Sequence, residues 1–106
     1  MIVAVKIYCP LTEEFMGKGG YWNKKGKSWS CLKDAKLAIC PNYGFNEKET
    51  CSEFWLFSDD GTLQKQPVSD YFIDYFERQI KEAIFEESRY KYRNALNLIQ
   101  QYIKLK

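Results

Sequence analysis

The 106-residue chain has no histidine, the side chain used most often as a general base in enzymes and as a metal ligand in proteins. It also has no apolar run close to the roughly 18 residues that a membrane-spanning helix requires. Residues 1–6 lack the basic segment and the long apolar segment of a signal peptide. These absences favour a cytoplasmic protein that does not contact a membrane.

The four cysteines lack the close spacing of a structural zinc site. Successive members of the set Cys9, Cys31, Cys40 and Cys51 are at least nine positions apart, whereas zinc ligands usually include a pair with about two to four residues between them. An even number of cysteines would suit disulfides, but disulfides are typical of secreted proteins. We expect four reduced thiols, no bound metal and no cofactor; a four-thiolate zinc site is the alternative.

The sequence also lacks the constellations that carry most enzyme chemistry. The glycines of segment 17–20 are not followed by the Lys-Ser/Thr pair and the helix of a phosphate-binding loop. The adjacent acids at 59–60 suit a turn, and those at 86–87 suit the solvated face of a helix. Because a Cys or Ser nucleophile would have to use Lys, Asp or Glu as its base, we expect that the protein is not an enzyme.

What is present predicts one α+β domain spanning residues 1–106. Its first part, residues 1–67, is expected to be mainly β with a short helix capped by Ser30, and residues 68–106, which contain no Gly or Pro, are expected to be helical. Two apolar stripes in this tail do not share one helix face, which favours a break near residues 86–89 over one long helix. The expected sheet is small and antiparallel, with about four strands at residues 2–8, 20–29, 53–57 and 62–66.

Charge is segregated along the chain. Residues 1–45 carry a net charge of +4, residues 46–88 a net charge of −7, and residues 89–106 five basic residues and no acid. The segments can neutralise one another in the fold, or they can create a field that steers a charged partner. The basic tail supplies three candidate binding residues, Arg89, Lys91 and Arg93.

Segment 18–29 interleaves aromatic rings with lysines. Lysines contact phosphates and flat rings stack on bases, so the segment is a candidate partner-binding hairpin; an ordinary hairpin with solvated lysines is the alternative. Adjacent residues of a strand point to opposite sides, and we expect Trp22 to be the exposed ring while Trp29 anchors the following helix. The candidate binding residues of this segment are Lys18, Tyr21, Trp22, Lys24, Lys25 and Lys27.

A family resemblance rests on the first third of the chain. The opening strand, the Tyr-x-x-Lys-x-Gly-Lys-x-Trp pattern of residues 21–29 and the Ala-Lys of residues 35–36 resemble small uncharacterised proteins of bacterial viruses. The resemblance implies a small phage-encoded protein of the host cell cytoplasm that binds host factors, as anti-CRISPR-like inhibitors of defence systems do.

Two functions follow as hypotheses. The leading one is a non-catalytic protein-binding module, a phage-type inhibitor of a host defence complex such as a CRISPR-Cas effector, with a host protein or ribonucleoprotein as its partner. The alternative is a small nucleic-acid-binding module that uses the aromatic–lysine hairpin and the basic C-terminal helix. The sequence leaves the partner and the oligomeric state open.

Overall fold

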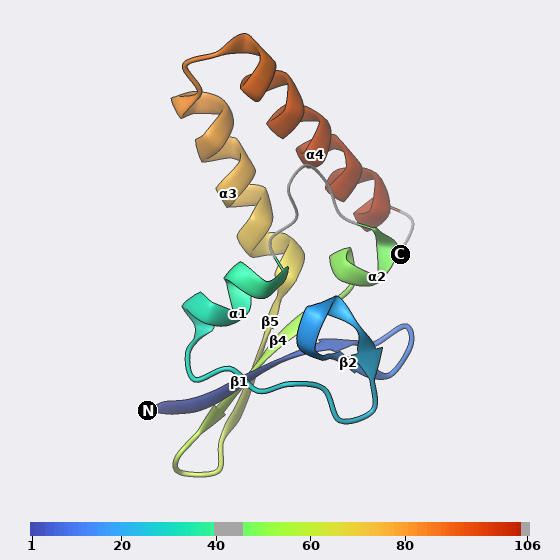
Figure 1. The fold of residues 1–106 in the computed structure, drawn as a ribbon, viewed down its shortest axis with the longest axis vertical. Helices are drawn as coiled ribbons and strands as arrows, with labels where there is room; N and C mark the ends of the chain where they lie inside the picture. Colours follow the sequence, from blue (N-terminus) through green and yellow to red (C-terminus); the bar gives the residue numbers. More distant parts are fainter. Residues whose placement is uncertain (40–45, 105–106) are drawn as a thin grey trace.

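A computed structural model of the chain describes residues 1–39 and 46–104 (Figure 1). It confirms the α+β class: a five-stranded antiparallel sheet in the order β3-β2-β1-β4-β5 is combined with helices. The strands are β1 (Ile2–Cys9), β2 (Glu14–Met16), β3 (Trp22–Asn23), β4 (Glu53–Ser58) and β5 (Leu63–Pro67). The helices are α1 (Leu32–Ile39), α2 (Glu47–Thr50), α3 (Val68–Glu82) and α4 (Glu86–Lys104). Cys40 lies outside the described residues, as does Pro41, where the sequence predicts the end of the short helix that follows Ser30.

The centre of the sheet follows the sequence prediction. Strands β1, β4 and β5 occupy the expected segments, and β1 pairs antiparallel with β4 so that Val5 faces Leu56 and Ile7 faces Phe54. The 58–61 turn that joins β4 to β5 was also predicted, and Gly61 adopts a positive φ there. Alternation along the strands places Val5, Ile7, Phe54 and Leu56 on one face, where all are fully buried.

The predicted strand over residues 20–29 is wrong except at Trp22–Asn23. Strand β3 pairs instead with β2, which lies in a segment expected to be a loop. The Asn23 carboxamide oxygen accepts hydrogen bonds from the backbone N–H groups of Lys25 and Gly26, and this local turn ends the strand. The chain then returns to β1, where Trp29 and Val5 exchange two backbone hydrogen bonds of 2.8 Å. A two-strand pair plus one bridge therefore replaces the predicted hairpin.

The helical tail consists of two helices, as the offset apolar stripes favoured. The break lies at residues 83–85, slightly before the predicted position, because Ala83 has extended backbone angles. Helix α3 begins directly after Pro67, so Ser69 is buried in its first turn and does not cap it. Similarly, α1 begins at Leu32, one residue later than a cap at Ser30 would place it. The sequence did not predict the short helix α2, whose first turn is capped by the Asn46 side chain.

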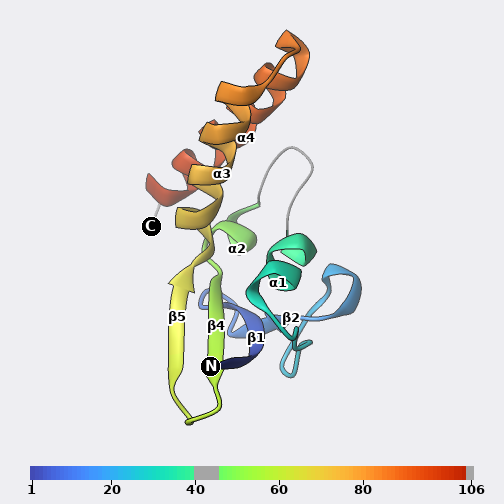
Figure 2. The ribbon, with the colours of Figure 1, turned by 90° about the vertical axis from the view of Figure 1, so that its left-hand side faces the viewer.

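The core lies between the sheet and the helices. The inner face of the sheet packs against α1 and against the lower parts of α3 and α4, where α3 contributes Phe72 and Phe76 and α4 contributes Ala95 and Ile99. Above this core α3 and α4 form a helical hairpin whose end at residues 83–85 points away from the sheet (Figures 1 and 2). The molecule is accordingly elongated, measuring 45 × 28 × 24 Å.

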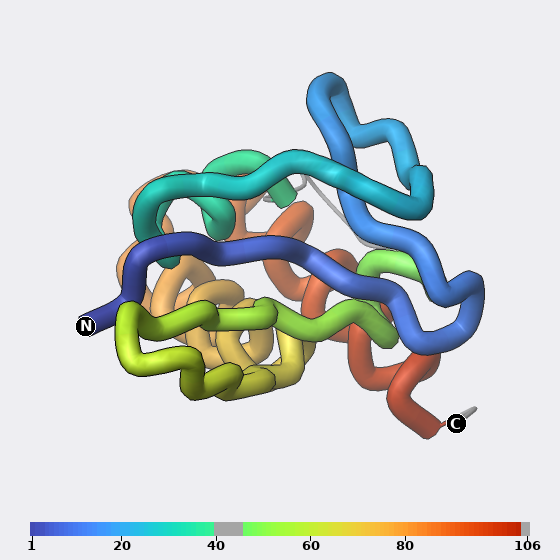
Figure 3. Tube along the Cα trace, turned by 90° about the horizontal axis from the view of Figure 1, so that it is seen from below, coloured from blue at the N-terminus to red at the C-terminus, as the bar shows by residue number. Residues whose placement is uncertain are grey.

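The outer face of the sheet is open. Seen from below in Figure 3, strands β1, β4 and β5 run in front of the helices, and no described helix lies over them. No described helix therefore covers the side chains of this face, although the turn at residues 23–26 touches its edge at Lys6 and Phe15. The fold thus leaves two surfaces unpartnered, the outer face of the sheet and the end of the helical hairpin.

Candidate binding surfaces

Four aromatic rings gather on the outer face of the sheet. Tyr8 of β1 lies 4.4 Å from Trp55 of β4 and 4.8 Å from Phe15 of β2, measured between ring centroids. Trp55 also lies 5.2 Å from Phe15 and 6.4 Å from Phe57. All four rings remain partly exposed to solvent. We call these four residues the aromatic face; the spacings are those of mutually attractive aromatic pairs.

Strand pairing explains why these rings meet. Tyr8 is directly opposite Phe15 in the β1–β2 pair, while Trp55 is opposite both Lys6 of β1 and Lys65 of β5. Cross-strand partners share a face, so three neighbouring strands contribute rings to one surface. The same pairing brings the two lysines into it.

The two lysines lie over the rings. Lys6 Nζ is 5.0 Å from the centroid of Phe15, and Lys65 Nζ is 4.6 Å from that of Trp55. Within residues 1–39 and 46–104 neither ammonium forms a salt bridge, although Lys6 Nζ donates a 2.9 Å hydrogen bond to the carbonyl of Lys25. Glu53, opposite Tyr8 and Pro67, adds a carboxylate at one end. The surface is thus aromatic and carries exposed positive charge.

Part of the predicted binding segment borders the aromatic face. Asn23 is opposite Phe15, so the turn that follows places the exposed Lys24 and Lys25 at its edge. Lys18 lies in a separate short helical turn, and Lys27 Nζ is 5.5 Å from the ring of Trp29 instead. The structure therefore joins two of the predicted lysines to a surface that was not predicted.

The expected exposure of Trp22 is wrong. Trp22 packs against the core and its ring lies 5.0 Å from Lys48 Nζ, whereas the neighbouring Tyr21 is 77% exposed. Neighbouring residues of β3 do point to opposite sides, but β3 pairs with β2 so that Trp22 is opposite the buried Met16 and turns inward. Trp29, which was expected to anchor the helix, packs against the core and bridges to Val5.

The second predicted basic group lies at the other end of the molecule, so the two groups do not form one site (Figure 1). Arg89 ties the helical hairpin together: its guanidinium donates to the carbonyl of Ala83 at 3.0 Å and of Ile80 at 3.4 Å, and it pairs with Glu86. Lys91 pairs with a carboxylate one helical turn away, 3.7 Å distant, and Arg93 is exposed.

Replacing Arg89 by alanine is expected to lower the free energy of unfolding by about 1–3 kcal/mol, the usual cost of leaving hydrogen bonds to a charged group unmade. The matched variant Arg93→Ala removes the same side chain from an exposed position and is expected to change stability by less than about 0.5 kcal/mol. Urea unfolding of the two variants measures the difference. Equal stabilities would show that Arg89 does not hold the helical hairpin together.

The end of the helical hairpin exposes two large apolar side chains. Ile84 is 88% exposed and Phe85 is 72% exposed, and both lie in the connection between α3 and α4. We call these two residues the apex. Ile84 continues the apolar helical spacing of Phe76 and Ile80, which predicts a buried position; its exposure follows from the extended backbone at Ala83, which ends that helix early.

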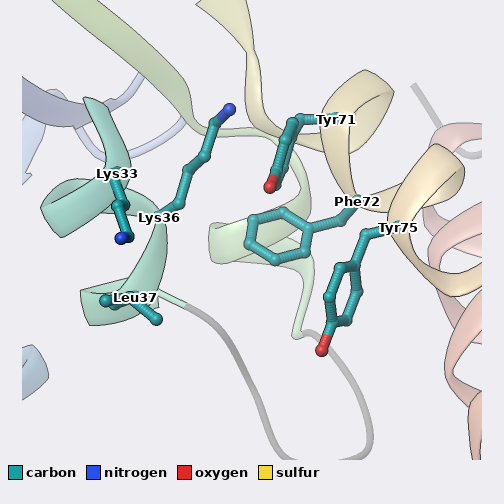
Figure 4. A pocket seen from close by; sticks show the side chains of 6 residues that line it. All are labelled: Lys33, Lys36, Leu37, Tyr71, Phe72 and Tyr75. Atoms are coloured by element: carbon teal, nitrogen blue, oxygen red, sulfur yellow. The ribbon is translucent and has the colours of Figure 1, made fainter. Parts of the chain in front are cut away.

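A cavity of about 330 Å³ lies between α1 and α3 (Figure 4). Lys36 Nζ lies 3.5 Å from the centroid of the Tyr71 ring. Burial lowers the pKa of Lys36 from its usual value, and the nearby charge of Arg78 lowers it further. The volume suits a small ligand, and the two lysines in its lining would favour an anion. The lining residues are Lys33, Lys36, Leu37, Tyr71, Phe72 and Tyr75.

In the part of the chain that the structure describes, no three His, Cys, Asp or Glu side chains are grouped as metal ligands. Cys9 is a buried free thiol, Cys31 is an exposed free thiol, and Cys51 is buried. No described helix is both long and apolar enough to cross a membrane. No family model, curated protein or solved structure matches the chain.

Proposed function

We propose that the chain is a non-catalytic protein-binding module that docks on its partner through the apex. The observation that carries this proposal is the exposure of Ile84 and Phe85 at the tip of a projecting helical hairpin. Burying one such side chain contributes about 1.5–3 kcal/mol. Large apolar side chains gathered at one exposed place mark interaction sites on proteins.

The charges around the apex favour a protein partner over a polyanion. Three glutamates lie within five residues of the apex, but Glu86 and Glu87 are paired with Arg89 and Lys91, and Lys81 precedes Glu82. The local charge is therefore balanced, which suits insertion of apolar side chains into an apolar pocket of a partner. The resemblance of residues 2–39 to small phage proteins favours a host defence complex as the class of partner.

A comparison of matched variants tests this function. The tagged protein is used to capture partners from lysate of a bacterium that carries a CRISPR-Cas system, and captured proteins are identified by mass spectrometry. Ile84→Ser combined with Phe85→Ser is expected to reduce capture of the partner at least tenfold. The control Leu11→Ser changes another exposed apolar residue and is expected to retain the partner.

The outcomes separate the two parts of the proposal. A defence complex that is lost with the apex variant and kept with the control supports both the docking site and the class of partner. A different protein lost in the same way supports the docking site and contradicts the class of partner. A partner retained by the apex variant, or no partner at all, contradicts the proposed function.

A further inference from the structure

We propose that the aromatic face binds single-stranded nucleic acid, as a second site independent of the apex. Its four rings come from three neighbouring strands and lie on a part of the sheet that no described helix covers. Bases of a single strand are free to stack on exposed rings, and each stacked base adds binding free energy with little dependence on sequence. A duplex keeps its bases stacked inside and offers no such contact.

The size of the platform suits a short run of bases. Phe15 of β2 and Phe57 of β4 flank Trp55, and their ring centroids lie 5.2 Å and 6.4 Å from the centroid of the Trp55 ring. Other β-sheet platforms of this kind stack about two or three bases. Tyr8 and Trp55, whose centroids are 4.4 Å apart, form the centre of this platform.

Positive charge is arranged around the rings where a phosphate backbone would pass. Lys6 and Lys65 belong to the face, and Lys24 and Lys25 lie at its edge beside Phe15. Against these four lysines the face itself carries the carboxylate of Glu53 at one end. Without a ligand, the ammonium groups of Lys6 and Lys65 lie over the rings. When a single strand binds, its bases stack on the rings and the two lysines contact its phosphates.

The indole N–H of Trp55 is the second feature that points to a ligand on this face. This N–H group is buried and has no hydrogen-bond acceptor among the described residues. Buried donors are normally satisfied, so an unsatisfied one on a binding surface indicates a missing acceptor. A base carbonyl or a phosphate oxygen that displaces the side chains over the ring would provide it.

Binding is measured by fluorescence anisotropy with end-labelled oligo(dT) and oligo(U) of about 12 nucleotides, a length within the usual site size. We expect both oligonucleotides to bind and to quench the tryptophan fluorescence, because Trp55 lies in the site. The logarithm of the association constant is expected to fall with the logarithm of the salt concentration with a slope of about −2 to −3, as for about three or four phosphate contacts. Tighter binding of oligo(U) would assign RNA as the ligand, and tighter binding of oligo(dT) would assign DNA.

Variants with matched controls locate the site. Phe57→Leu keeps an apolar side chain but removes a ring and is expected to weaken binding about 5- to 100-fold. The control Tyr90→Leu removes a ring that is 65% exposed but lies on α4, away from the face, and it is expected to bind as the wild type does.

The lysines are tested in the same way. Lys6→Glu with Lys65→Glu is expected to weaken binding at least tenfold. The control Arg78→Glu with Lys81→Glu makes the same charge change at exposed positions of α3 and is expected to leave the affinity nearly unchanged. The single variant Lys65→Gln, on the exposed strand β5, gives the same test with the smallest risk to folding. Circular dichroism confirms that each variant is folded.

Three results would overturn the proposal. One is the absence of binding at low salt. Another is an affinity for duplex equal to that for single strands and insensitive to Phe57→Leu. The third is a Phe57→Leu variant that binds oligonucleotides normally but loses a protein partner, which would make the face a protein-docking surface. None of these results bears on the apex, where the proposed function is tested separately.

Discussion

Replacing Phe76 by alanine is expected to remove a large part of the stability of the protein. Phe76 is fully buried in α3, and its ring lies 6.3 Å from that of Phe72 and 6.1 Å from that of Tyr92 on α4. Truncating a buried phenylalanine costs about 3–5 kcal/mol, because apolar contacts are lost and a cavity remains. The total free energy of unfolding of a small domain is only about 5–15 kcal/mol. We therefore expect a fall in melting temperature of about 15 °C or more.

Phe85→Ala provides the matched control on the same helical hairpin. The Phe85 ring is 72% exposed, so its removal is expected to change the free energy of unfolding by less than about 0.5 kcal/mol. Thermal melts followed by circular dichroism compare the two variants. If Phe85→Ala destabilised the protein as much as Phe76→Ala, the apex would be packed against another part of the chain, and it would not be available to a partner.

The sequence was sufficient to predict the strands and helices that have strong local signals. Strands β1, β4 and β5 have runs of apolar or alternating residues bounded by turns, and α3 follows Pro67 without interruption. Strand β2 has three residues and β3 two, too few for any periodicity to appear. Their pairing depends on the turn at Asn23, whose side-chain hydrogen bonds end one strand and prevent the longer predicted hairpin.

The aromatic face was only partly predictable. Alternation places Trp55 and Phe57 on one side of a predicted strand, and Tyr8 lies in another predicted strand. Which side of β1 meets which side of β4 is set by the register, with Lys6 opposite Trp55, and no local pattern states this register. The interleaved rings and lysines of segment 18–29 predict a binding site in the segment that contains the turn beside the face, but they do not predict the face itself.

The two proposed surfaces are suited to different ligands because the fold separates them. The apex is apolar with balanced charge and lies at the far end of a 45 Å molecule from the sheet. The aromatic face carries lysines and lies on the exposed side of that sheet. A protein partner at one end therefore leaves the other end accessible to a nucleic acid, which suits a ribonucleoprotein as the partner of the whole molecule.

Replacing Gly26 by alanine is expected to have the second-largest effect, because two costs combine at that position. Gly26 has φ +65°, a conformation that costs a residue with a side chain about 1–2 kcal/mol. An added Cβ would also overlap the Cβ of Phe15 and lie 3.1 Å from the carbonyl oxygen of Met16. Relieving such overpacking commonly costs about a further 1–3 kcal/mol. We expect a total loss of about 2–5 kcal/mol in the free energy of unfolding.

Gly61→Ala separates these two costs. Gly61 has φ +87° in the turn between β4 and β5, and an added Cβ would meet no atom within 4 Å, so only the backbone cost of about 1–2 kcal/mol applies. Urea unfolding should therefore show Gly26→Ala to be the less stable variant. Because the overlap displaces Phe15, Gly26→Ala should also weaken oligonucleotide binding, whereas Gly61→Ala should not. Equal stabilities would mean that the 23–26 turn does not rest on Phe15, and that Lys24 and Lys25 do not border the aromatic face.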